Sequence, residues 1–150
     1  MIRIIAIGKK HDAWVRDGLQ RYYKRLRKPF SVDWVLLPYS TKSYQKARQD
    51  ESEAILSCIK PGDYVILLDE RGKNLSSPEM ASYLQEAISS RSVTFVIGGA
   101  YGVDDRLRER SDLVWSLSRL VFPHMIVRLM LLEQIYRAQE IARGGPYHHI

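Results

Sequence analysis

The sequence predicts an α/β domain in which a mostly parallel β-sheet carries helices on both faces. Short apolar runs typical of strands alternate with longer segments in which apolar residues recur about every 3.6 positions. Residues 64–68 form a continuous apolar run, which is typical of a strand covered on both faces. The chain of 150 residues is long enough for one domain with a sizeable core, so we expect residues 1–150 to form a single domain.

Two strand-and-helix units open the chain. Residues 1–7 predict a buried strand, and residues 12–28 predict an amphipathic helix that Asp12 could cap. Residues 32–37 predict the second strand, and a polar helix over about 44–59 follows it. A parallel sheet requires this repeated order, because the connection after each strand has to return the chain to the end of the sheet at which the next strand begins.

The middle of the chain repeats the pattern. The apolar run 64–68 predicts a third strand, and residues 69–72 predict its exit loop. Ser76 and Glu79 have the spacing of a capping box, which predicts that a helix begins there and continues to about residue 89.

The last third predicts two strands and two helices. Residues 93–97 predict a buried strand and residues 113–117 a short one, with a short charged helix over 105–110 between them. The longest helix is expected over 124–142, and Gly144 begins the Gly-Gly-Pro stretch that ends it.

In a sheet of this type, ligands bind outside the carboxyl ends of the strands, so the site is expected on the loops after Leu68, Ile97 and Leu117. Residues 98–102 contain three glycines, which allow a ligand to approach the backbone closely. Their spacing matches neither the dinucleotide-binding fingerprint nor a Walker loop. A tight turn between strand and helix explains the glycines equally well.

The connection over residues 116–124 is unusually apolar and ends in a proline that suits the start of the next helix. Such a loop, with free backbone amides, could sandwich a flat adenine ring. The alternative interpretation is a strand that continues into the core.

The helix over 124–142 carries apolar residues on more than one side, which indicates that it is internal or shared with a partner subunit. Glu133 and Arg137 have the spacing of a structural ion pair. His124 and Arg128 are also four apart and could hold a phosphate or orient a base at the mouth of the site. A histidine that only stabilises the helix start is the alternative.

The charge distribution favours a nucleic-acid partner. Lys and Arg exceed Asp and Glu by 23 to 17, and the sequence pI is about 9.5. Residues 9–28 hold eight basic side chains against two acidic ones, with two tyrosines between them, which is typical of an RNA-binding patch. An ordinary solvated helix face has the same composition.

Several classes of site are excluded or disfavoured. Cys58 is the only cysteine, so the chain has no intramolecular disulfide and no zinc cluster of cysteine ligands. The four histidines lack metalloprotease spacing and no nucleophile elbow is present, so we expect no metal and no hydrolase activity. Without a long apolar run or a signal peptide, a cytoplasmic protein is expected.

Four motifs, in order and with matching spacing, resemble one family across nearly the whole chain. They are FVIGGAYG (95–102), SLSRLVFPH (116–124), VRLMLLEQIYRA (127–138) and PYH (146–148). The resemblance is to the methyltransferase H family of the SPOUT superfamily, which methylates N3 of a pseudouridine in 23S ribosomal RNA. It implies a C-terminal trefoil knot, a homodimer, S-adenosyl-L-methionine as methyl donor, and the assembled ribosome as substrate.

The resemblance also implies the site residues. The cofactor pocket is expected to include Leu68, Gly98, Gly99, Leu117, Ser118, Arg119, Leu120, Val121, Phe122 and Pro123. Two departures from the family are that Tyr101 stands in a variable part of the glycine loop, and that the tail continues as His149 where members often carry a basic residue.

Methyl transfer from a sulfonium is an in-line displacement, which needs positioning and a desolvated pocket rather than a covalent nucleophile. The weakly acidic N3 proton must leave, so we expect His148 or Tyr147 to assist, with Arg128 and His124 positioning the nucleotide. The alternatives are a non-catalytic RNA-binding protein and a ribose 2′-O-methyltransferase of the same superfamily.

Overall fold

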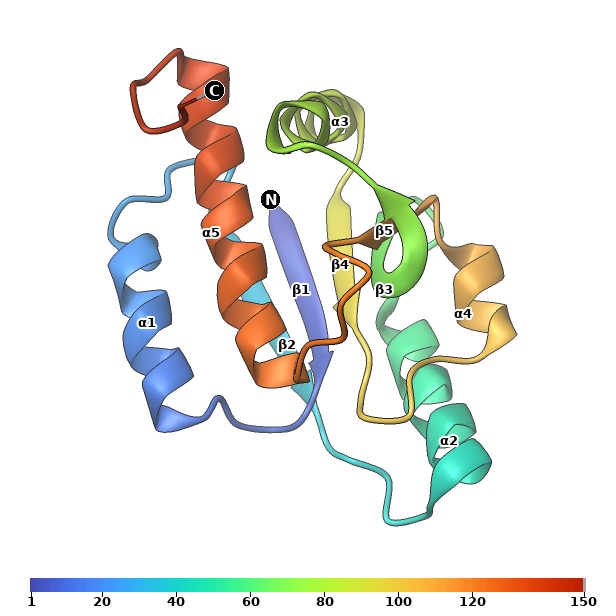
Figure 1. Cartoon of the computed structure of the whole chain (residues 1–150). Helices are drawn as coiled ribbons and strands as arrows, with labels where there is room; N and C mark the ends of the chain where they lie inside the picture. The colour runs from blue at the N-terminus through green and yellow to red at the C-terminus, as the bar shows by residue number, and fades with distance from the viewer. Residues whose placement is uncertain (150) are drawn as a thin grey trace.

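The computed structural model describes residues 1–149 and has a five-stranded sheet in the order β2-β1-β4-β3-β5 (Figure 1). All pairings are parallel, so the strands expose their carboxyl ends along one edge. The strands are β1 (Ile2–Ile7), β2 (Val32–Leu37), β3 (Tyr64–Asn74), β4 (Val93–Ile97) and β5 (Leu113–Ser116). The predicted α/β class with a parallel sheet is confirmed.

Helices cover both faces of the sheet, as expected. The helices are α1 (Ala13–Tyr23), α2 (Tyr44–Cys58), α3 (Ser77–Ser90), α4 (Asp105–Arg110) and α5 (His124–Arg143). Buried residues of α1, α3 and α5 share one apolar cluster with the sheet, whereas buried residues of α2 and α4 share a second cluster on the other face. Among the described residues, no helix is both long enough and apolar enough to cross a membrane.

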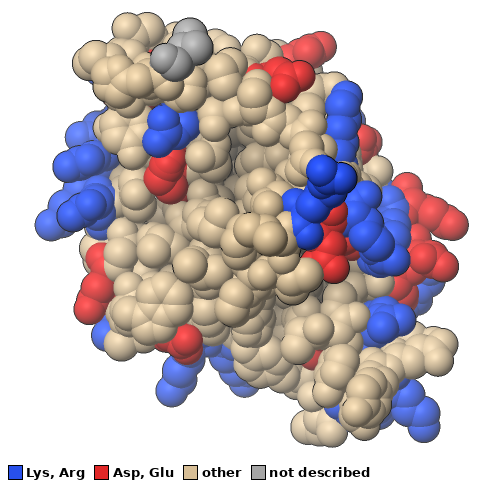
Figure 2. Space-filling model, in the orientation of Figure 1, with Lys and Arg blue, Asp and Glu red and all other residues tan. Residues whose placement is uncertain are grey.

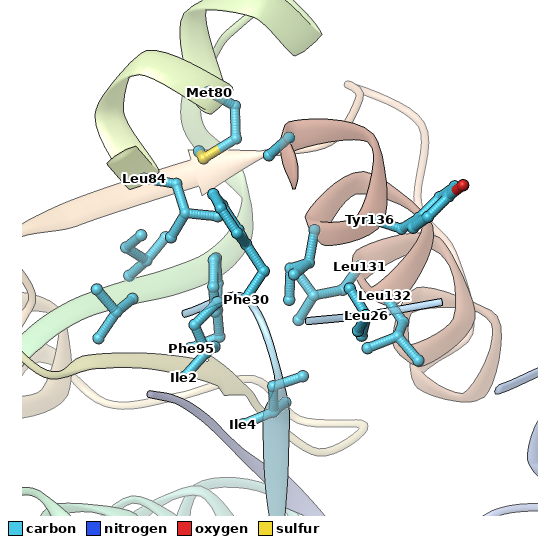
Figure 3. Close-up of a cluster of buried hydrophobic side chains, with 14 of the residues drawn as sticks. Ile2, Ile4, Leu26, Phe30, Met80, Leu84, Phe95, Leu131, Leu132 and Tyr136 are labelled. Atoms are coloured by element: carbon cyan, nitrogen blue, oxygen red, sulfur yellow. The ribbon is translucent and has the colours of Figure 1, made fainter. Parts of the chain in front are cut away.

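The larger core lies where the sheet meets α3 and α5. Ile4 and Phe95 of the sheet point toward Leu84 of α3 and Leu131 of α5, and all four side chains are almost completely buried (Figure 3). Full burial of one such side chain stabilises a fold by roughly 1.5–3 kcal/mol. This core fixes α5 against the sheet and thereby sets where the helix begins.

The first helix is shorter than predicted. It ends at Tyr23 rather than near residue 28, and Asp12 stands at the N-cap without a capping hydrogen bond from its side chain. Gln139 of α5 explains the early end, because its side chain accepts from Arg27 N at 2.7 Å and donates to Arg25 O at 3.0 Å. The backbone after α1 is thus bound to α5 instead of continuing its own helix.

Strand β3 is longer than predicted, because residues 69–72 belong to the strand rather than to a free exit loop. After a register shift beyond Leu68, the strand pairs again with β5, placing Lys73 opposite Trp115. Gly72 is needed for this approach, since a Cβ atom there would lie 2.5 Å from the carbonyl oxygen of Val114.

Local signals elsewhere are confirmed. Ser76 and Glu79 form a complete capping box at the start of α3, and Glu133 binds Arg137 with Nε and Oε1 2.8 Å apart. Gly144 ends α5 with a φ of 70°, a conformation that favours glycine.

Candidate functional site

A cavity of about 1090 Å³ lies at the carboxyl edge of the sheet, where β3, β4 and β5 end and α5 begins. One part of its wall is apolar and includes Leu68, Ile97, Trp115, Leu117 and Val127. The three predicted strand-exit positions therefore lie together in one hollow.

The glycine loop after β4 forms part of the wall. A Cβ atom on Gly98 would lie 2.9 Å from Val103, and one on Gly99 would lie 2.5 Å from Oε1 of Glu51. The loop closes on itself, because Gly102 N donates to Gly99 O at 3.0 Å. Protein atoms therefore occupy the side on which a Cβ would stand, and the loop presents bare backbone to the cavity.

The connection between β5 and α5 forms the adjacent wall. Ser116 Oγ donates to Ser118 O at 2.8 Å, and Ser118 Oγ accepts from Leu120 N at 3.1 Å, which fixes a tight bend. Of the ten expected cofactor residues, seven line the cavity: Leu68, Gly98, Gly99, Leu117, Ser118, Val121 and Phe122. The other three, Arg119, Leu120 and Pro123, are exposed and do not line it.

The remaining wall is charged and comes mainly from α2, β3 and α4. The sequence predicts the site on the loop after Leu68 but names none of these charged residues. Asp69 pairs with Arg108, and Asp104 pairs with Arg106 at 2.7 Å. Asp69 directly follows Leu68, so the strand-end rule that identified Leu68 could have identified it too.

Two buried nitrogen atoms of cavity-lining residues have no hydrogen-bond partner among the described residues, Nε1 of Trp115 and Nδ1 of His124. The other ring nitrogen of His124 lies 3.1 Å from the hydroxyl of Tyr39. Burial, and secondly the charge of Arg128, lower the pKa of His124 below its ordinary value of 6.5. The lowered pKa favours a neutral imidazole at the start of α5, and its Nδ1 is a buried atom that no described residue satisfies.

The spacing of Arg128 from His124 predicts that both side chains lie at the mouth of the cavity. In the structure, Arg128 does not project there. Its side chain is fully buried, and its Nη2 donates to Ile7 O at 2.8 Å and to Gly8 O at 3.1 Å. Its Nη1 donates to Lys10 O at 3.1 Å and lies 3.1 Å from Nδ1 of His11. The guanidinium group clamps the β1–α1 connection to α5 and is buried away from any nucleotide.

The C-terminal tail lies far from the cavity within one chain. Tyr147 packs edge-on against Tyr136 at 4.8 Å, and Nδ1 of His148 lies 3.1 Å from Arg137 Nη1. Both contacts are at the last turns of α5, whereas His124 stands at its first (Figure 1). From His124 to Arg137 the helix rises about 20 Å, so a single chain does not bring His148 to the cavity.

Comparison with known proteins gives consistent matches over nearly the full length. A family model described as "Predicted SPOUT methyltransferase" matches residues 1–148. The ribosomal RNA large subunit methyltransferase H of Desulfitobacterium hafniense is 40% identical, covering 98% of both chains. The protein of the same name from Synechococcus sp. is 46% identical over 98% of this chain and 93% of its own, and that of Pelotomaculum thermopropionicum is 41% identical over 99% and 98%.

Proposed function

Because the chain belongs to the SPOUT methyltransferases, and within them to the ribosomal RNA large subunit methyltransferase H family, we propose that it methylates N3 of a pseudouridine in 23S ribosomal RNA of the assembled ribosome. The methyl donor is S-adenosyl-L-methionine. The observation that carries the proposal is the cavity at the carboxyl edge of the sheet, with bare glycine backbone on one wall and an apolar bend on the next.

The chemistry of the cavity wall fits this cofactor. Leu117, Val121 and Phe122 offer an apolar surface for the adenine ring, and the unpartnered Nε1 of Trp115 offers a donor. Carboxylates on the charged wall, such as Asp105, suit a ligand that carries ammonium and sulfonium groups. When bound, S-adenosyl-L-methionine supplies an electrophilic methyl group on a sulfonium.

Residues at the ends of the strands hold the reactants in line and keep water out of the cavity. The apolar wall desolvates the reacting atoms, and His124 positions the nucleotide from the start of α5. Arg128 acts behind them by holding the β1–α1 connection. His148 or Tyr147 assists departure of the N3 proton.

The tail reaches the cavity from a second subunit. Within one chain, His148 and the cavity are at opposite ends of α5, so a homodimer in which each tail completes the other pocket resolves the separation. Large apolar side chains remain exposed on α1 and around the start of α5, as an interface requires, and they include Trp14, Leu120, Val121 and Ile126. We further propose that the C-terminal part of the chain forms a trefoil knot.

The RNA backbone is bound by the basic surface of α1 and its flanks. All eight basic side chains of residues 9–28 are exposed: Lys9, Lys10, Arg16, Arg21, Lys24, Arg25, Arg27 and Lys28. Figure 2 shows a concentration of blue atoms along the left edge of the molecule, where α1 lies in Figure 1. Such a surface binds phosphates without regard to sequence.

The test is transfer of labelled methyl groups from S-adenosyl-L-methionine to ribosomes that lack the modification, compared with naked 23S RNA. We expect strong labelling of the large subunit in ribosomes and weak labelling of the naked RNA, because the assembled particle shapes the target. Absence of label on both substrates, with cofactor binding intact, would contradict the proposed substrate.

A further inference from the structure

We propose that Tyr44 and Tyr101 form a stacking platform for an unpaired RNA base next to the target nucleotide, and that Arg48 binds the phosphate of that nucleotide. The inference deepens the proposed function and rests on it, since it assumes that RNA is the substrate. It assigns a site to a pair of tyrosines that the cofactor cavity and the basic surface of α1 do not explain.

The two tyrosines come from different elements and meet at the rim of the cavity. Tyr44 is the first residue of α2, whereas Tyr101 belongs to the glycine loop after β4 and lines the cavity. Their ring centroids are 5.4 Å apart, and the ring planes are inclined by 46°. A base on these rings would therefore lie beside a nucleotide that enters the cavity.

The rings are unusually exposed for aromatic side chains. Tyr44 is 74% exposed and Tyr101 is 39% exposed, so their contact with each other leaves most of the Tyr44 ring surface in water. Tyr44 also has a φ of 52°, an unfavourable conformation for a residue with a large side chain. The fold holds both rings at the surface although neither contributes to a core.

Arg48 connects the platform to a phosphate site. It stands four residues after Tyr44, and both residues contact Tyr101: the Tyr44 ring packs against the Tyr101 ring, and Arg48 Nε donates to Tyr101 O at 2.8 Å. Its two Nη atoms have no partner among the described residues. The guanidinium group therefore anchors the glycine loop with one nitrogen and offers its fork to a ligand.

Three carboxylates that line the cavity with Arg48 are paired with other cations. Arg106 binds both Glu53 at 2.5 Å and Asp104 at 2.7 Å, and Lys42 binds Asp50 at 3.1 Å. Their charges are engaged, which leaves the cation of Arg48 for a phosphate. In Figure 2, the region where α2 begins lies at lower right and has tan atoms bordered by blue ones.

Exposed aromatic rings beside a free guanidinium group are the combination that binds single-stranded RNA. Bases stack on tyrosine rings, and the guanidinium group binds the backbone that connects the bases. A base inside a duplex is already stacked on both faces, so the ligand must be an unpaired nucleotide. This is the state of bases in loops, where sequence-specific RNA enzymes find their targets.

The test compares steady-state methylation of ribosomes by Tyr44→Ala, Tyr101→Ala and the two corresponding Phe variants. Each Ala variant should raise the KM for ribosomes about tenfold, because loss of one stacked base costs roughly that factor. Tyr44→Ala, whose side chain does not line the cavity, should also leave kcat and the Kd for S-adenosyl-L-methionine unchanged. Both Phe variants should retain the wild-type KM, since the ring carries the interaction. Tyr83→Ala, which removes an exposed tyrosine from α3, is the matched control.

An unchanged KM for ribosomes in both Ala variants would contradict the proposed platform. A KM that is raised as much in the Phe variants as in the Ala variants would contradict it too. A weakened Kd for the cofactor with unchanged KM would also overturn it, because the rings would then only shape the glycine loop. If the wild-type protein binds ribosomes without methylating them, the proposed function fails, and the Kd of the same variants for ribosomes decides the platform on its own.

Arg48→Gln tests the phosphate contact separately. Loss of one phosphate contact should reduce the slope of log Kd for ribosomes against log salt by about one, whereas the tyrosine variants should leave that slope unchanged. An unaltered slope in Arg48→Gln would remove the arginine from the proposed site.

Discussion

The Arg128 guanidinium group binds the backbone of Ile7, Gly8 and Lys10 and thereby holds the β1–α1 connection against α5. Its spacing from His124 is local, and the sequence predicts from it that the two residues share one helical face. Its hydrogen-bond partners lie in residues 7–11, about 120 positions earlier in the chain, and no periodicity connects the two segments. The same limit applies to Glu51, whose carboxylate meets Gly99 only in the folded chain.

Gly99 leads to a prediction at the cofactor pocket. In Gly99→Ala, the new Cβ would lie 2.5 Å from Glu51 Oε1 and 3.2 Å from Ile7, so the glycine loop must shift toward the cavity. We expect affinity for S-adenosyl-L-methionine to fall about tenfold in calorimetry. The matched variant Gly62→Ala, where a Cβ meets nothing within 4 Å, should bind normally. Equal affinity in Gly99→Ala and the wild type would contradict the proposed pocket.

The lowered pKa values of His11 and His124 predict a loss of stability in weak acid. Burial, with the charge of Arg128 second, lowers the pKa of both imidazoles below 6.5, and Asp12 opposes this effect only at His124. The unfolded chain then binds protons on them more readily than the folded protein does, so the free energy of unfolding falls as pH drops below about 6.5. Urea denaturation should show this loss, and it should be smaller in the double variant His11→Gln, His124→Gln. An identical pH dependence in that variant would refute the assignment.

At the scale of elements, signals contained within a few residues predicted the structure well. The capping box of α3, the glycine that ends α5 and the type of every element followed from the local sequence. The extension of β3 to Asn74 did not, because it depends on pairing with β5, a strand about 40 residues later. The early end of α1 likewise depends on Gln139 of the last helix.

The capping box permits a quantitative prediction. Ser76→Ala removes the acceptor of Glu79 N and leaves that backbone donor at the start of α3 without its partner. We expect a loss of about 1 kcal/mol in the free energy of unfolding, measured by urea denaturation. Ser43→Ala at the start of α2 is the control, since Ser43 makes no capping hydrogen bond from its side chain. Equal losses in both variants would show that the cap of α3 does not stabilise the fold.

At the scale of the whole molecule, the position of the cavity could be predicted, because the carboxyl ends of parallel strands share one edge of the sheet. The strand order β2-β1-β4-β3-β5 was not predicted from the sequence. The separation of the tail from the cavity was not predicted either, because it depends on where the two ends of α5 lie relative to the sheet.

The separation predicts complementation between subunits. His148→Ala should abolish most turnover while preserving cofactor affinity, and Gly99→Val should block the pocket. When the two chains are refolded together in equal amounts, half of the dimers contain one chain of each variant. In each of these mixed dimers one of the two sites has both an intact pocket and an intact tail, so about a quarter of wild-type activity should return. Each variant refolded alone is the control. No recovery in the mixture would mean that the tail does not act across the dimer.

The most direct test of the central claim is mass spectrometry of nucleosides from ribosomes methylated by this protein with isotopically labelled S-adenosyl-L-methionine. We predict that the label is on N3 of a single pseudouridine of 23S RNA. Label on a ribose 2′-oxygen, or on a base other than pseudouridine, would contradict the proposed reaction while leaving membership of the methyltransferase family intact.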